Sequence, residues 1–219
     1  MKHSFQKRFT SAIDENFETV QPFYDSRLIV MVELTNLRNE ILNCLLLGLY
    51  QTSIFSTNHF LERLIKVSLI KNHTQGFNYS NAVAYNEKIE ESKILFDSLV
   101  LAESLKKAKQ EGLITESEMT ELTSLRRKIR NPYTHAEISK INEGSPKSFK
   151  GFMFSFEDVK HKLINKEKLE LPEITEINTF SPTFAQLQQE DNSKIIAFNY
   201  FKKIYDLMLK MENRLSAKK

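Results

Sequence analysis

An arginine and a histidine five positions apart are the residues of this sequence best suited to do chemistry together. They bound the string Arg130-Asn131-Pro132-Tyr133-Thr134-His135. The guanidinium of Arg130 is permanently charged and suits phosphate oxygens, whereas His135 can take up or release a proton near neutral pH. Such a pair could cleave RNA without a metal, with His135 moving a proton at the ribose 2′-hydroxyl or the leaving 5′-oxygen and Arg130 stabilising charge at phosphorus. One histidine serves one of these roles at a time, so the full reaction needs a second copy of the pair.

The local context of this pair says more than its spacing does. By chance alone the sequence would hold about 0.2 arginine–histidine pairs at this distance, or about 0.01 when an asparagine must follow the arginine. Pro132 disfavours the α conformation at the residue before it, and Asn131 and Pro132 suit the cap and first position of a helix. We therefore expect one helix to end at Arg130 and a new one, capped by Asn131, to hold His135 in its first turn. The free N–H groups of that turn would attract the same phosphate.

Other kinds of site find no support in the sequence. The 5 glycines form no phosphate-binding loop or nucleophile elbow, the 5 histidines are scattered, and Cys44 stands alone, so we expect no metal and no cofactor. A single cysteine is typical of a reduced, cytoplasmic protein. No signal peptide or membrane span is indicated. The net charge of +3 is too small to name a partner.

The spacing of apolar residues predicts that helices position the pair. Recurrence at steps of three and four predicts a helix from Arg27 to about residue 49, a second around 60–69 that returns antiparallel after a break at 51–53, and a long C-terminal helix over 197–215. Helices are also predicted over about 87–112, with Leu95 facing inward and Gly112 as the stop, and from the capping box Thr115–Glu118 to Arg130. Residues 72–86, 142–156 and 171–182 are expected to be irregular, apart from a short strand at 152–156, and a short helix is expected over 159–165.

The motif and the helices before it resemble the HEPN superfamily, the higher eukaryote and prokaryote nucleotide-binding domains. The resemblance covers roughly residues 27–141, including Phe60-Leu61-Glu62-Arg63-Leu64-Ile65-Lys66 on the second long helix. It implies an all-α antiparallel helical bundle, usually a homodimer, in which the arginine and histidine of both copies form one metal-independent endoribonuclease site. It also implies single-stranded or transfer RNA as the substrate, and a toxin or antiviral defence role with a possible antitoxin or defence partner protein.

The resemblance assigns roles to individual residues. Arg130 and His135 would be catalytic, and Asn131 would support them by capping and orienting the loop. Glu62 resembles a polar position that many members keep on the second long helix, and Lys66 follows it on the same face. One subgroup carries a tyrosine two residues after the histidine as a target for nucleotide addition; Ala136-Glu137 stand here, so that regulation is not expected.

The basic run before the motif allows two interpretations. Arg126 and Arg127 could extend a track for the RNA backbone, because clustered cations attract phosphate. A cationic last turn of an ordinary helix explains the run equally well.

The sequence leads to one main hypothesis and two alternatives. We expect residues 1–219 to form a single all-α domain of the HEPN type with a decorated C-terminal part, acting as an endoribonuclease. The first alternative is a catalytically silent HEPN-like dimerisation or adaptor module that binds a partner protein or a nucleotide. The second, a helix-turn-helix regulator over residues 115–140, is weaker because Pro132 crowds the turn and the second helix is short.

Overall fold

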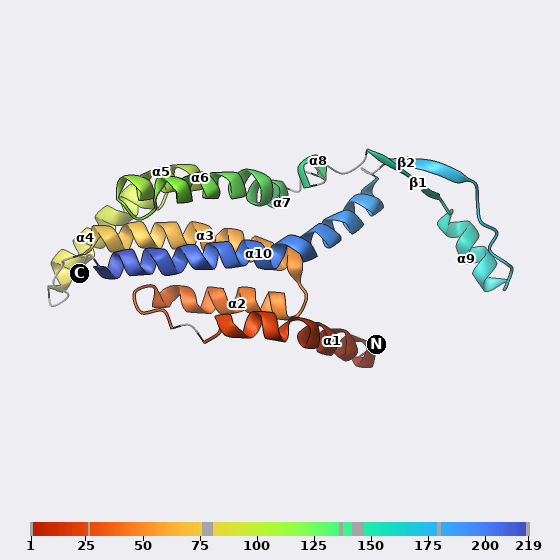
Figure 1. Ribbon diagram of the computed structural model, residues 1–219, viewed down its shortest axis with the longest axis horizontal. Coiled ribbons are helices and arrows are strands. Elements are labelled where there is room, and N and C mark those ends of the chain that lie inside the picture. The colour runs from red at the N-terminus through yellow and green to blue at the C-terminus, as the bar shows by residue number, and fades with distance from the viewer. Residues whose placement is uncertain are drawn as a thin grey trace.

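Two long helices, α3 (Tyr50–His73) and α10 (Pro182–Ala217), lie side by side along the middle of the molecule (Figure 1). The computed structural model describes residues 2–25, 27–75, 81–135, 138–141, 147–178 and 181–217. Helices α1 (Lys2–Val20) and α2 (Thr35–Leu46) cover one side of the pair, and α5 (Leu101–Gln110) and α6 (Glu116–Leu125) cover the other. Helix α4 (Ala82–Phe96) lies at the end of the bundle where α10 finishes.

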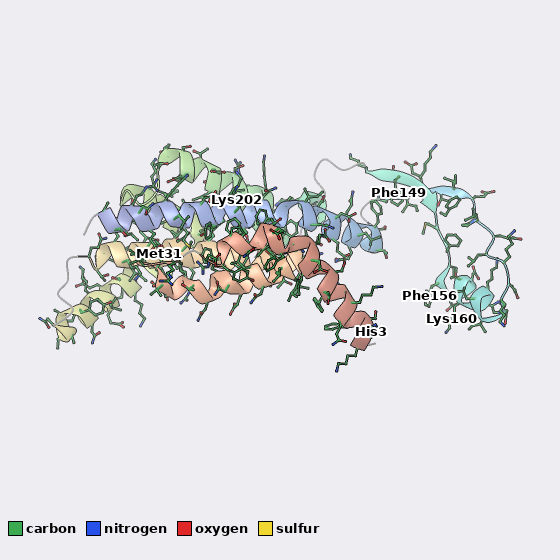
Figure 2. The ribbon with its side chains drawn as sticks, turned by 60° about the horizontal axis from the view of Figure 1, so that its bottom comes forward. His3, Met31, Phe149, Phe156, Lys160 and Lys202 are labelled. Carbon is green, nitrogen blue, oxygen red and sulfur yellow. The ribbon has the colours of Figure 1, made fainter. Side chains whose placement is uncertain are left out.

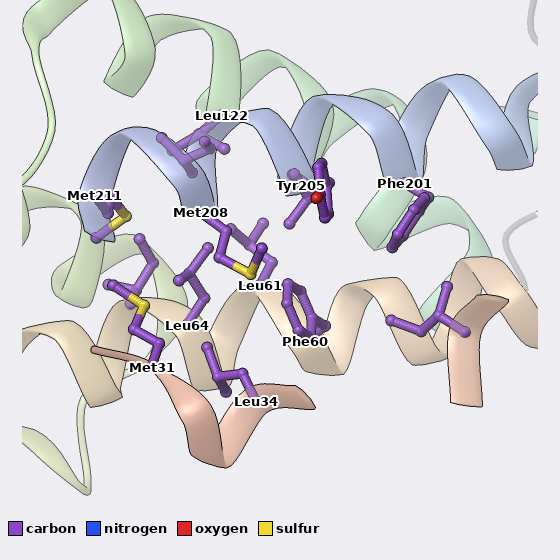
Figure 3. Close-up of a cluster of buried hydrophobic side chains, with 14 of the residues drawn as sticks. Met31, Leu34, Phe60, Leu61, Leu64, Leu122, Phe201, Tyr205, Met208 and Met211 are labelled. Atoms are coloured by element: carbon purple, nitrogen blue, oxygen red, sulfur yellow. The ribbon is translucent and has the colours of Figure 1, made fainter. Parts of the chain in front are cut away.

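The core is the seam between α3 and α10, where apolar stripes from both helices meet (Figure 3). Its fully buried members include Phe60, Leu61, Leu64, Phe201, Ile204, Met208 and Met211. Met31 and Leu34, from the segment before α2, close the seam on the α2 side. The predicted all-α bundle is confirmed, since the described chain is mostly helical and its strands form one small sheet.

The helix predicted from Arg27 begins later than expected. Residues 27–31 are not helical; a 3-10 turn over Val32–Leu34 precedes α2. The carboxylate of Glu212 on α10 accepts the backbone N–H groups of Ile29 and Val30, the latter at 2.7 Å. These groups are therefore satisfied by a side chain 182 residues away rather than by a helix, while the apolar side chains of Leu28 and Met31 are still buried. The periodic pattern therefore predicts correctly that these apolar side chains are buried. Its prediction that residues 27–31 are helical is wrong.

Two further predictions are also wrong: the position of the break between α2 and α3, and the single helix over 87–112. The break between α2 and α3 lies at Leu47–Leu49, where Gly48 adopts φ +70°, and not at residues 51–53. The helix predicted over 87–112 is two helices, α4 and α5, since Val100 is extended and donates its N–H to the Glu103 carboxylate at 3.2 Å. Leu95 is half exposed, and Phe96 takes the buried position instead.

The capping box and the C-terminal helix are where the sequence placed them. The Thr115 hydroxyl accepts the N–H of Glu118, and the Glu118 carboxylate accepts the N–H of Thr115 at 2.8 Å. Gly112 follows α5 with φ +69°. Helix α10 contains the predicted stretch 197–215 and extends it in both directions.

Residues 147–178, which we call the arm, extend away from the bundle beyond α8 (Figures 1 and 2). Strand β1 (Ser148–Phe152) pairs antiparallel with β2 (Ile174–Asn178), and α9 (Phe156–Ile164) lies between them in the chain. The strand therefore begins earlier than the expected 152–156, and the expected irregular segment after residue 171 contains a strand. The ring of Phe149 stacks on Phe184 of α10, with 4.0 Å between centroids. No residue of the arm is buried.

Candidate functional site

The motif lies on a helix that continues through Pro132. Helix α6 runs into a π turn, Arg126–Arg130, and then directly into α7 (Asn131–His135). Asn131 has φ −64° and ψ −50°, and its N–H bonds to the carbonyl of Arg126 five residues back. The predicted break, with Asn131 as the cap of a new helix, is therefore wrong. A new helix N-terminus next to Arg130, and its free N–H groups, are absent from this part of the described chain.

The π turn gives a physical reason for the missing break. In a regular α-helix Pro132 would leave the carbonyl of Lys128 without its N–H partner, and the proline ring would clash with that carbonyl. A π turn is wider than an α turn and shifts the hydrogen bonds by one residue. It lets Pro132 follow without ending the helix. Single π turns often lie at functional sites.

Arg130 is held against α3 by the acidic residue that the resemblance singled out. Its Nη2 atom forms an ion pair with the Glu62 carboxylate, and its Nη1 atom donates to the Oδ1 atom of Asn131 at 3.3 Å. The Nε atom of Arg130 is buried and has no hydrogen-bond partner among the described residues. The side chain keeps 23% of its surface exposed, and that of Glu62 keeps 34%. Arg130 is thus oriented by two neighbours while part of the guanidinium side chain faces solvent.

Lys66 is not brought to the motif. Its Nζ atom donates to the backbone carbonyl of Asp97, just after α4. Glu62 and Lys66 are one turn apart on α3, yet Glu62 faces the π turn and Lys66 the junction between α4 and α5. The structure therefore gives Lys66 a contact that holds the bundle together, and no contact with Arg130.

Arg126 and Arg127 lie on an open, basic hollow beside the motif. The hollow measures about 720 Å³ and is lined by Ser124, Arg126, Arg127, Lys128, Asn131, Ser139 and Lys140. The last two come from the short helix α8 (Ile138–Ile141). Within the described chain, no carboxylate lies within ion-pair distance of Arg126, Arg127 or Lys128. Positive charge without neutralising partners suits the phosphates of a nucleic acid.

A chain of hydrogen bonds runs from the buried core to the motif. Tyr200 on α10 donates its hydroxyl to Asn58 Oδ1 at 2.7 Å, and Asn58 on α3 donates to the Thr134 hydroxyl at 3.3 Å. Burial raises the pKa of Tyr200 well above its ordinary value, so the phenol stays protonated and remains a donor. The residue directly before His135 is therefore anchored to both central helices.

Sequence reasoning missed Asn58 and Tyr200. Tyr200 lies within the predicted C-terminal helix, but nothing in the sequence singles it out. A signal was available for Asn58, because it lies one turn before Glu62 on α3. A second tie was missed as well, from the Ser193 hydroxyl on α10 to the buried Tyr133 hydroxyl at 3.4 Å.

His135 is the last residue of α7, and its backbone continues the helix that holds Arg130. The His135 side chain and residues 136 and 137 lie outside the described residues, and so does the expectation based on Ala136-Glu137.

Two properties of the described residues bear on other kinds of site. They contain no group of three histidine, cysteine, aspartate or glutamate side chains placed to hold a metal ion. None of their helices combines the length and apolar composition that a membrane crossing needs. Comparison of the chain with protein-family models, with curated proteins and with solved structures finds no match.

Proposed function

We propose that the chain is a metal-independent endoribonuclease of the HEPN type, with Arg130 and His135 as its catalytic residues and a homodimer as its working form. One observation supports this most: Glu62 on α3 holds Arg130 in place beside an open hollow, where Arg126, Arg127 and Lys128 have no ion-pair partner among the described residues. The alternative, an adaptor module, accounts for that arrangement only if the module binds a nucleotide. The activity would serve a cytoplasmic toxin or antiviral defence effector.

The proposed reaction is a transesterification. His135, neutral in one copy, takes the proton of the ribose 2′-hydroxyl as that oxygen attacks phosphorus. The bond from phosphorus to the 5′-oxygen breaks, and the protonated His135 of the second copy gives its proton to the leaving oxygen. Arg130 stabilises the extra negative charge on the phosphoryl oxygens. The products are a 2′,3′-cyclic phosphate and a free 5′-hydroxyl.

The basic hollow would bind the substrate next to the reacting phosphate. Arg126 and Arg127 line it together with Asn131, which also contacts Arg130, so bound backbone would lead toward the arginine. Contacts of this kind neutralise phosphates and release counterions, so binding should weaken steeply with salt. Single-stranded RNA or an exposed loop of transfer RNA would fit the hollow's open form.

The test is cleavage of single-stranded RNA and transfer RNA by the purified full chain in EDTA. We expect products with 2′,3′-cyclic phosphate ends, and we expect His135→Ala and Arg130→Ala each to lower the rate by roughly 100-fold or more. His59→Ala and Arg63→Ala are matched controls, because both side chains are exposed on α3 away from any role proposed here, and they should keep full activity. Circular dichroism must show that all four variants are folded.

Two results would contradict the proposal. One is cleavage that persists in a folded His135→Ala variant. The other is a folded wild-type chain that cleaves neither RNA; this would leave the adaptor alternative in place.

A further inference from the structure

Two contacts, one turn apart, join α3 to the helix that carries the motif. Glu62 forms the ion pair with Arg130, and Asn58, one turn earlier on α3, donates to the hydroxyl of Thr134, one turn later on the motif helix. The two helices therefore run antiparallel here, and Arg130 and Thr134 lie on one face of the motif helix. Unlike the buried Asn58, Thr134 is exposed. Its hydroxyl lies where the chain of hydrogen bonds from the core reaches the surface.

The hydrogen bonds beneath Thr134 have a defined direction. The 2.7 Å from the Tyr200 hydroxyl to Asn58 Oδ1 is typical of a bond donated by a hydroxyl, whereas the 3.3 Å from Asn58 to Thr134 is too long for one. Burial keeps the Tyr200 phenol protonated because it raises its pKa, and Asn58 Oδ1 is its acceptor within the described chain. The Asn58 amide is thus held with its nitrogen toward Thr134, and the Thr134 oxygen is the acceptor of that bond.

The hydrogen of the Thr134 hydroxyl is left without an acceptor. Three other threonines in helices, Thr57, Thr120 and Thr123, donate their hydroxyl to the backbone carbonyl four residues earlier. Thr134 makes no such bond, and it donates to none of the residues that the structure describes. A hydroxyl oxygen that accepts one hydrogen bond can still donate another. Because Thr134 is exposed, this donor is open to a molecule that arrives from solvent.

The surroundings of this donor favour an anionic oxygen as its acceptor. Arg130 lies on the same face, with 23% of its side chain exposed, and the neighbouring Glu62 carboxylate is already paired with it. Arg126 and Arg127, in the turn before Arg130, line the basic hollow. A hydroxyl donates a stronger hydrogen bond to a charged oxygen than to a neutral one. A phosphoryl group has several such oxygens, so it can accept from a guanidinium and a hydroxyl at the same time.

We propose that the Thr134 hydroxyl donates a hydrogen bond to a phosphoryl oxygen of bound RNA, on the same phosphate that Arg130 contacts. Asn58 and Tyr200 are then positioning residues: they hold the Thr134 oxygen as an acceptor and leave its hydrogen for the ligand. The inference rests on the proposed function for the identity of the ligand. It adds to the arginine and histidine of the motif a neutral donor that selects phosphate without contributing charge.

The test is binding of a fluorescent single-stranded 2′-O-methyl RNA to the full chain, measured by anisotropy. This RNA keeps the phosphates and lacks the attacking 2′-hydroxyl, so it binds without reacting. Thr134→Val keeps the shape of the side chain and removes the hydroxyl, and it should raise the dissociation constant roughly 10-fold. Thr134→Ser keeps the hydroxyl and should stay within about twofold of the wild type. The matched control is Thr120→Val on α6, where the exposed threonine donates to the Glu116 carbonyl at 3.0 Å; it should bind like the wild type.

Salt separates the role of Thr134 from that of the basic hollow. Arg126→Ala should reduce the slope of log Kd against log salt concentration by about 1, because one phosphate contact with a cation is lost. Thr134→Val should leave the slope unchanged, since a hydroxyl carries no charge. Tyr200→Phe should weaken binding less than Thr134→Val, because Asn58 keeps its place and loses only the bond that fixes its orientation. Tyr205→Phe should leave binding unchanged.

Three outcomes would overturn the inference: a wild-type chain that does not bind the RNA, an affinity that Thr134→Val leaves unchanged, or an equal loss of affinity in Thr134→Ser or Thr120→Val. Circular dichroism confirms that the variants are folded; since Thr134 is exposed, its substitution opens no core. Because the probe cannot react, this result is separate from the cleavage test. A chain that binds through Thr134 and cleaves no RNA contradicts the proposed reaction alone, and a chain that cleaves RNA but is indifferent to Thr134→Val contradicts this contact alone.

Discussion

The seam between α3 and α10 buries its apolar side chains, whereas the arm leaves its apolar side chains exposed. In the seam, Phe60, Leu64 and Met208 are entirely buried, whereas no residue from 147 to 178 is buried. The bundle obtains its stability from contacts within one chain. The arm has a similar supply of apolar side chains but keeps them at the surface. The contrast separates residues that hold the fold from residues that are available to another molecule.

The largest difference between the seam and the arm should be in how much the free energy of unfolding falls when an apolar side chain is shortened. Leu64→Ala should lower the free energy of unfolding by about 2–5 kcal/mol, because it loses transfer free energy and leaves a cavity in the seam. Leu171→Ala in the arm, where the side chain is 72% exposed, should change it by less than about 0.5 kcal/mol. Urea unfolding followed by circular dichroism measures both, at a protein concentration where both are monomeric. Equal losses in the two variants would remove the distinction.

Acid should weaken the bundle through one ion pair that ties α6 to α10. Arg214 forms two hydrogen bonds with Glu118, at 2.7 and 2.9 Å, and these lower the pKa of Glu118 to about 2. Because the pKa is lower in the folded chain, the stabilisation is complete above the ordinary pKa near 4.5 and is lost as pH falls toward 2. The loss should reach roughly 3 kcal/mol.

The measurement is the urea midpoint between pH 6 and pH 2. Glu118→Gln should remove most of this pH dependence. Glu121→Gln, in an exposed pair with Lys203 one turn along α6, should keep it. If the two variants respond alike to acid, the tie between α6 and α10 is not the source.

The smallest of these effects concerns the polar part of the seam, beneath the motif. Tyr200→Phe should lower the free energy of unfolding by about 1–2 kcal/mol, because Asn58 loses the donor to its Oδ1 atom in a buried place. Tyr205→Phe, on the same helix and nearly buried but without a hydroxyl partner among the described residues, should cost less than about 0.5 kcal/mol. RNA cleavage should also fall in Tyr200→Phe and not in Tyr205→Phe, since only Tyr200 supports Thr134. An effect of equal size in both would assign no special role to the chain of hydrogen bonds.

Features with a local cause could be predicted from the sequence. The apolar stripe of α10 and the Thr115–Glu118 capping box each depend on residues within a few positions of one another, and both are found where expected. The all-α class follows from the same periodicity. The arm's second strand was not predicted, because its partner residues lie 22 or more positions away in the chain.

Features set by distant contacts could not be read this way. Ile29 and Val30 stay outside the helix because Glu212, near the other end of the chain, accepts their N–H groups. The resemblance singled out Glu62 as a polar position but did not predict its pairing with Arg130, and the spacing of residues 68 positions apart gives no sign that they meet. At Asn131 the rule that proline disfavours the α conformation at the residue before it does not hold, because the π turn accommodates Pro132 within the helix.

The π turn also acts as a one-residue insertion in the helical register. Each residue of an α-helix is turned by about 100° from the one before it, so an additional residue in one turn rotates all later side chains by that angle relative to the earlier ones. Arg126 and Arg127 therefore face the open hollow while Tyr133 and Pro132, only a few residues later, are buried against the bundle. If the same residues instead formed an ordinary α-helix, every side chain after residue 130 would be turned by about 100°, and the buried face of α7 would leave the bundle. The direction in which the side chains of the motif point therefore depends on the π turn as well as on the residue types.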